Sequence, residues 1–164
     1  MKRVVVTGFG LVTPLGCGNE INWKNLISGK SGARSIQKFD SSSFKCKVAC
    51  EVPQDNSIEG SFIAEDHIDR KELKKIDEFI KFTLAASKEA FDNSGLVSIT
   101  DPKSHRAGCI IGSGMGGLPG IEETSVMFKE GKKISPFFIT GRIINMSSGY
   151  LSIKYNLKGP NYST

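Results

Sequence analysis

The sequence predicts an α/β fold, and three observations lead to that prediction. A β-branched, apolar stretch at Lys2–Thr7 suits a buried strand. Apolar residues recur every three to four positions from about Arg70 to Asn93, as they do in an amphipathic helix. A second apolar stretch, Arg106–Ile111, leads into a glycine-rich turn and another helical segment. Strands that alternate with helices are typical of an α/β arrangement.

In the first third of the chain, glycines and Pro14 break the first strand into a loop over residues 8–16. Asn19 can then cap a short helix around the single Trp23, and that helix ends at residues 29–32. Alternation over Cys46–Val52 predicts one short strand before the long helix.

The long helix at residues 70–93 has Asp69 as its expected N-cap and Gly95 as the residue that ends it. After the second strand, the sequence predicts three more helical stretches and a final strand. These are a helix from Leu118 to Phe128, a stretch opened by Ser135-Pro136, a helix from Asn145 to Tyr155, and a strand beginning at Asn161–Thr164.

Composition limits the classes of protein to be considered. The 164 residues, 38% of them apolar and 24% charged, suit one globular domain or a fragment of a larger one. No apolar run is long enough to span a membrane, and the N-terminus is typical of a strand, not a signal peptide. The four cysteines match no zinc spacing, so we expect reduced thiols in a cytoplasmic protein without a metal.

The net charge of +5 is distributed unevenly, with basic ends and an acidic middle. A basic stripe interleaved with aromatic residues would indicate nucleic-acid binding, and the sequence contains none. A basic face for an acidic protein partner is compatible with this charge distribution.

A nucleotide-binding site is a further possibility, because Gly112, Gly114 and Gly117 satisfy G-x-G-x-x-G between a strand and a helix. That fingerprint also requires an acidic residue about twenty positions on, at the end of a second strand. No strand follows at that distance, so we interpret these glycines as turn or packing residues and expect no cofactor.

Candidate catalytic side chains are few. Cys109 lies in a predicted buried strand, Cys46 and Cys50 lack an identifiable histidine partner, and Cys17 lies in a loop. We interpret both histidines, His67 and His105, as solvated. The adjacent carboxylates Asp77 and Glu78 are also interpreted as a solvated face, since neighbouring helical residues do not face each other.

An ordered series of motifs nevertheless covers nearly the whole chain. It runs KRVVVTGFGLVTPLG, W..L..GKSG, FD.S.F..K.A.EV, KKIDEFI, R.G..IGSGMGGL..IE, KISPFF and INM.SG.LSIKYNLKGPN. The series resembles the N-terminal half of a β-ketoacyl-[acyl-carrier-protein] synthase. KISPFF and FD.S.F look like the type II, elongating branch of that family. The chain departs from the family at Cys50, where many relatives have Gly, and at Thr140, where Pro is common.

The resemblance implies the first half of a thiolase-like, five-layered α-β-α-β-α fold, with residues 1–164 as one incomplete unit. Family enzymes condense a cysteine-bound acyl group with malonyl-carrier protein in fatty acid elongation. The nucleophilic cysteine is implied about four residues beyond Thr164, and both catalytic histidines lie in the other half. We therefore expect the fold to be truncated before its last strand and the 164 residues alone to be inactive.

Binding residues can be carried over by the same resemblance. Gly114 and Met115 match the family's acyl-pocket loop, and Phe138 matches a residue that reaches across the dimer toward the partner's acyl pocket. The acidic acyl-carrier protein is expected to dock on five lysines, namely Lys71, Lys74, Lys75, Lys132 and Lys133, of which the first three are expected to form one helical ridge. A non-catalytic fragment that binds carrier protein or dimerises is the alternative, and a nucleotide-binding oxidoreductase is less favoured.

Overall fold

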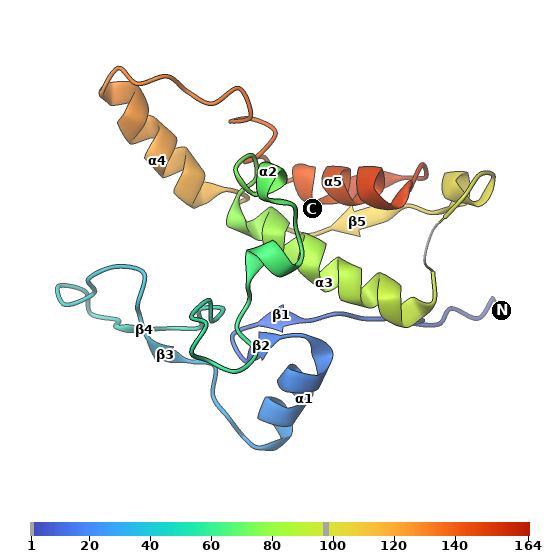
Figure 1. The fold of residues 1–164 in the computed structure, drawn as a ribbon, viewed down its shortest axis with the longest axis horizontal. Helices are drawn as coiled ribbons and strands as arrows, with labels where there is room; N and C mark the ends of the chain where they lie inside the picture. The colour runs from blue at the N-terminus through green and yellow to red at the C-terminus, as the bar shows by residue number, and fades with distance from the viewer. Residues whose placement is uncertain (1, 97–98) are drawn as a thin grey trace.

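The computed structural model describes residues 2–96 and 99–164. Helices and a pair of parallel strands pack together in the middle of the structure (Figure 1). Two helices, α3 (Glu78–Ser94) and α5 (Met146–Tyr155), pack against each other. Helix α5 also covers β5 (Cys109–Ile111) and β6 (Asn161–Ser163), which pair in parallel with Cys109 opposite Asn161 and Ile111 opposite Ser163. The predicted α/β class is confirmed by this arrangement.

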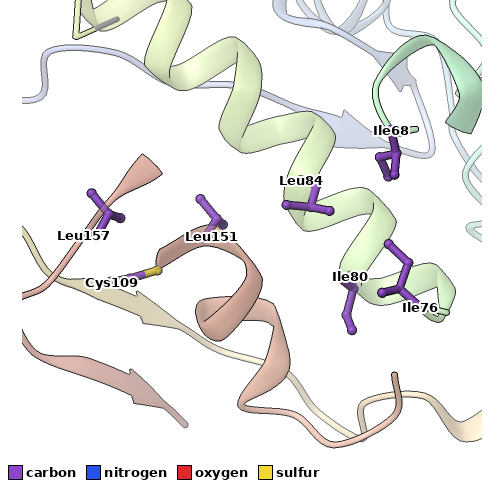
Figure 2. Packing of buried hydrophobic residues seen from close by; sticks show 7 residues of the cluster. All are labelled: Ile68, Ile76, Ile80, Leu84, Cys109, Leu151 and Leu157. Carbon is purple, nitrogen blue, oxygen red and sulfur yellow. The ribbon is translucent and has the colours of Figure 1, made fainter. Parts of the chain in front are cut away.

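The core lies where these elements meet, as Figure 2 shows. Helix α3 contributes Ile80 and Leu84, α5 contributes Leu151, and β5 contributes the Cys109 side chain. Because 3.6 residues make one turn, residues 80 and 84 project from the same face of α3 toward α5. The sequence prediction that Cys109 is a small core residue is confirmed.

The single long helix predicted over residues 70–93 is wrong: the structure has α2 (Arg70–Leu73), a turn, and then α3. Asp77 breaks the helix because its backbone is extended and its carboxylate accepts a hydrogen bond from the Glu78 amide, which makes it the N-cap of α3. Asp69 does precede α2 but makes no side-chain capping bond. Gly95 ends α3 in the left-handed conformation (φ 74°), as predicted.

The N-terminal third forms short elements. The hairpin of β1 (Val12–Thr13) and β2 (Gly16–Cys17) is followed by the predicted helix, α1 (Asn19–Ile27), and by the pair β3 (Arg34–Ser35) and β4 (Val48–Ala49). The N-cap of α1 is Gly18, not Asn19, because Asn19 Nδ2 donates to the Phe9 carbonyl. Only Val48–Ala49 of the predicted strand at residues 46–52 pairs with a neighbour.

The strand predicted at Lys2–Thr7 is not formed. Residues 2–7 lack strand pairing, and Val4–Val6 are exposed. A strand exists only when a neighbouring strand takes its backbone hydrogen bonds, and the apolar pattern alone cannot supply that neighbour.

In the second half, α4 (Leu118–Lys129) forms as predicted, whereas the stretch at Ser135–Pro136 is turns without a helix. The predicted strand at residues 106–111 begins only at Cys109, since Lys103–Arg106 form a 3-10 turn, η2. A second 3-10 turn, η1, is Ala64–Asp66. Helix α5 and strand β6 confirm the last two predicted elements.

The parallel pair β5–β6 is covered on one face only. Cys109 is 7% exposed beneath the helices, whereas the next residue, Ile110, is 68% exposed and Tyr162 on β6 is exposed as well. Successive side chains of a strand point to opposite faces, so the second face of this sheet is bare. A bare apolar face is expected of half of a multilayered fold. No helix in the described part of the chain is both long and apolar enough to cross a membrane.

Candidate functional site

The loop that follows β5 presents the first predicted binding residues. Met115 is 70% exposed, and a Cβ placed on Gly114 would meet nothing within 4 Å. Gly116 has a positive φ of 70° and donates its amide to Ser113 Oγ, so the loop turns tightly just after Met115. The result is a flexible, apolar thioether held at the surface of a turn.

The carboxyl ends of both parallel strands meet at this loop. The amide of Ser113, after β5, donates to the carbonyl of Thr164, after β6, at 2.9 Å. In open α/β sheets, ligands bind outside the carboxyl ends of the strands. The structure thus places residue 164 beside the turn that carries Met115.

The segment containing Phe138 is tied to the same loop. The amide of Gly117 donates to the carbonyl of Arg142 at 2.8 Å, and Phe138, which is half-buried, lies in a turn closed by its own amide and the Ser135 carbonyl. The loop predicted to belong to the chain's own acyl pocket and the segment predicted to reach toward a dimer partner's pocket are therefore neighbours within one chain. A cavity of about 650 Å³ lies elsewhere, between the η1–α2 region and α5, and neither Met115 nor Phe138 lines it.

The lysines predicted to bind the carrier protein differ in how exposed their side chains are. Lys71 and Lys74 are exposed, but the ridge predicted for them and Lys75 is wrong, because α2 ends at Leu73. Lys75 is half-buried, its ammonium lying 2.6 Å from Glu72 Oε1 and 5.2 Å from the centre of the Phe137 ring.

The second predicted basic pair follows α4 and is exposed. Lys132 forms an ion pair of 2.6 Å with Glu130. Lys132 and Glu130 are both accessible to solvent, so their ion pair is weak in water.

Cys17 and His67 come together although they are far apart in sequence. Cys17 Sγ lies 3.6 Å from His67 Nε2, and the imidazole stacks on Phe62 with ring centres 5.7 Å apart. The expectation that His67 is a solvated side chain is wrong, since it is half-buried; no motif relates the two positions.

The electrostatics of this pair favour uncharged partners. Burial, and then the nearby Glu89 and Asp66 carboxylates, raise the pKa of the Cys17 thiol. Burial lowers the pKa of the His67 imidazole, assisted by Lys88 and Lys154 and opposed by Asp66 and Glu89. A neutral thiol beside a neutral imidazole is a poor nucleophile.

The nucleotide interpretation fails at the first turn of α4. The amide of Gly120 donates to Asp77 Oδ2 at 3.1 Å, so the end of the helix that would bind a phosphate already holds a carboxylate of the same chain. A Cβ on Gly117 would lie 2.6 Å from that oxygen, which identifies this glycine as a close-packing residue. The interpretation of Asp77 as solvated is wrong for the same reason.

The remaining cysteines form no reactive group in the structure. Cys46 and Cys50 are exposed free thiols, and burial raises the pKa of Cys109. Among residues 2–96 and 99–164, no three His, Cys, Asp or Glu side chains are arranged to hold a metal ion.

Comparison with known proteins identifies the family. Residues 1–164 match the family described as the N-terminal domain of beta-ketoacyl synthase. The chain is 41% identical to 3-oxoacyl-[acyl-carrier-protein] synthase 2 of Rhizobium meliloti and 43% identical to that of Coxiella burnetii. Each alignment covers 99% of the chain but only 39% and 38% of the relative's length.

Solved structures show the same half. A beta-ketoacyl synthase from Burkholderia phymatum superposes with a TM-score of 0.76 at 22% identity, over 100% of this chain and 39% of that one. A ketosynthase in complex with its type II PKS acyl-carrier protein gives a TM-score of 0.72 at 25% identity, over 99% of this chain and 42% of that one. The architecture is therefore that of the N-terminal half of the thiolase-like ketosynthase fold, and the chain belongs to the β-ketoacyl synthase family.

Proposed function

We propose that the chain is the N-terminal part of a 3-oxoacyl-[acyl-carrier-protein] synthase 2, an acyltransferase of fatty acid elongation. The observation that carries the proposal is the alignment of 99% of the chain with relatives of that name at 41% and 43% identity. The geometry supports it, because the end of β6 lies beside the Met115 loop through the Ser113–Thr164 hydrogen bond.

The position of Thr164 supports a specific arrangement of the acyl group. A nucleophilic cysteine about four residues further on would be within about 14 Å of Thr164, even along a fully extended chain. An acyl chain attached to that cysteine could then extend past Met115 and, in a homodimer, past Phe138 of the partner subunit. Both side chains are apolar, and Met115 can change its rotamer to admit chains of different length.

The condensation itself would use groups outside these 164 residues. The acyl group is held as a thioester on the cysteine. Loss of carbon dioxide from the malonyl thioester breaks a carbon–carbon bond and leaves its electron pair on the α-carbon. That carbon attacks the acyl carbonyl, and the cysteine thiolate departs. Two histidines assist decarboxylation, and backbone amides hold the thioester oxygen, as the family resemblance implies.

The carrier protein is proposed to dock on the exposed lysines near α2 and after α4. An acidic partner approaching Lys71, Lys74, Lys132 and Lys133 would be attracted over roughly 10 Å at ordinary ionic strength. The ketosynthase that superposes on this chain was solved with an acyl-carrier protein, which agrees with such docking. We place the complete enzyme in the cytoplasm as a homodimer.

The test is an assay with a full-length synthase that contains this segment. It measures the condensation of a labelled acyl group, supplied as a thioester on its carrier protein, with malonyl-carrier protein. A β-ketoacyl product is expected, and its absence would refute the proposal. The 164 residues alone should give no product, because no catalytic cysteine–histidine group is formed among the described residues. Binding of carrier protein without product, by the full-length protein too, would instead favour a non-catalytic binding role.

A further inference from the structure

Asp77 and Arg142 form an ion pair where three segments of the chain meet. Asp77 Oδ2 lies 3.4 Å from Arg142 Nε, and the two side chains are only 11% and 18% exposed. Among the described residues, that buried Nε makes no hydrogen bond, so its attraction to the carboxylate is a matter of charge. A pair this sheltered from water is screened less than a surface pair.

The carboxylate of Asp77 and the backbone around Arg142 connect the start of α3 to both binding segments. Asp77 Oδ1 accepts from the Glu78 amide, and Oδ2 accepts from the Gly120 amide at 3.1 Å. The Asp77 amide donates to the Gly141 carbonyl at 3.1 Å, and the Gly117 amide donates to the Arg142 carbonyl. One acidic and one basic residue thus connect the Met115 loop, the first turn of α4 and the Phe138 segment.

Glycines permit this close approach. A Cβ on Gly117 would lie 2.7 Å from Arg142 Cδ, and one on Gly120 would lie 1.9 Å from Arg142 Nε. A Cβ on Gly141 would lie 2.1 Å from the Lys75 carbonyl oxygen. Real Cβ atoms do not approach so closely, so a larger residue at Gly141 would push its segment away from the Lys75 backbone, and larger residues at Gly117 and Gly120 would displace the Arg142 side chain.

We propose that Asp77 and Arg142 are positioning residues that hold both the Met115 loop, at the chain's own acyl pocket, and the Phe138 segment, which reaches toward the pocket of a dimer partner, and thereby set acyl chain-length selectivity; this rests on the proposed function. Met115 is two residues from Gly117 and Phe138 four from Arg142, so the pair limits where both side chains can lie. Without the ion pair, the backbone hydrogen bond from the Gly117 amide to the Arg142 carbonyl still joins the loop to the segment.

The test compares variants of a full-length synthase that carries this segment. Arg142→Met keeps the aliphatic stem and removes the charge, Arg142→Lys keeps the charge, and Asp77→Asn keeps a capping side chain at α3. The readout is the ratio of kcat/KM for long and short acyl primers. We expect Arg142→Met and Asp77→Asn to change that ratio roughly tenfold or more, since misplacement by about 1 Å can cost a hundredfold. Arg142→Lys, which keeps the charge, should have a ratio close to that of the wild type.

Lys38→Met is the matched control, because it removes a 2.7 Å ion pair to Glu78, the residue after Asp77, without touching either binding segment. Its selectivity ratio should equal that of the wild type. Amide hydrogen exchange provides a second readout, in which Arg142→Met should expose Gly117 and Gly120 to faster exchange and leave α5 unchanged. An unchanged selectivity ratio in Arg142→Met and Asp77→Asn would overturn the inference, whatever the exchange rates show. An inactive wild-type enzyme would instead refute the proposed function on which it rests.

Discussion

Cys17 Sγ and His67 Nε2 lie 3.6 Å apart, although 50 positions separate the two residues in the sequence. The arrangement has the form of a nucleophile beside a base, but both pKa shifts oppose that use. Burial raises the pKa of the thiol and lowers the pKa of the imidazole, so neither becomes charged near neutral pH. The pair is a half-buried hydrogen bond that joins β2 to the segment before α2.

We expect the order of thiol alkylation to follow this environment. At pH 7.5, iodoacetamide should modify the exposed Cys46 and Cys50 first, Cys17 more slowly, and the core residue Cys109 only on unfolding. Mass spectrometry of timed digests measures the order. Modification of Cys17 ahead of Cys46 would show that its thiol is activated.

The lowered pKa of His67 makes stability depend on pH. The folded chain binds a proton on this imidazole less readily than the unfolded chain, whose pKa is about 6.5. The stabilisation that the neutral His67 gives the folded state is complete above the unfolded-state pKa. It is lost as the pH falls through the lower pKa of the folded state, so the free energy of unfolding should decrease from pH 7.5 to pH 5.5. His67→Gln, which cannot titrate, should show a smaller decrease in urea unfolding. An NMR titration of His67 with a midpoint at or above 6.5 would contradict this account.

Local patterns in the sequence were enough to predict the helices at residues 19–27, 118–129 and 146–155, as well as the final strand. Each has a 3.6-residue apolar pattern or a flanking glycine or proline, and such signals act within a few residues. The strand expected at Lys2–Thr7 failed because strand formation depends on a distant partner, which no local pattern specifies.

The prediction of the site from the sequence was also limited by contacts between residues that are far apart in the chain. The Asp77 carboxylate, which caps α3 at the division of the helix, also bonds to Gly120, forty-three positions away, and faces Arg142. Lys75 is half-buried, and its ammonium lies over the Phe137 ring, which belongs to a distant segment of the sequence. The motif series predicted Met115 and Phe138 as acyl-pocket residues, but only the folded chain shows which side chains lie between their segments.

Met115 is proposed to line the acyl pocket, and its substitution tests that role in a full-length synthase. Met115→Phe puts a rigid ring where a flexible thioether lies, so long acyl primers should be obstructed and the shortest ones spared. Overpacking costs about 1–3 kcal/mol, which is about a 5- to 150-fold loss of kcat/KM for the obstructed primers. Leu118→Phe, at an exposed position of α4, serves as a control for the added bulk. Equal losses for short and long primers would indicate a general packing role for Met115.

The docking surface is tested by charge reversal at Lys71 and Lys74, which are exposed. Lys75 is left unchanged, because its ion pair with Glu72 and its contact with Phe137 would confuse loss of docking with local rearrangement. Each surface pair is worth about 0–1 kcal/mol and is screened by salt, so a single substitution should do little. Lys71→Glu with Lys74→Glu should raise the KM for acyl-carrier protein severalfold at low salt and weaken its salt dependence.

The matched control for that experiment is Lys45→Glu with Lys47→Glu, which changes the net charge equally on the exposed connection between β3 and β4. If the carrier protein were attracted only by the net charge of the enzyme, both double variants would raise the KM by the same amount. Docking at α2 predicts instead that only the Lys71 and Lys74 variant is affected. The rate with a small acyl thioester that lacks the carrier protein should remain at the wild-type level in both, because neither variant changes the acyl-pocket segments. A carrier-protein KM that is unchanged by reversal of Lys71 and Lys74 would mean that these lysines are an ordinary solvated surface.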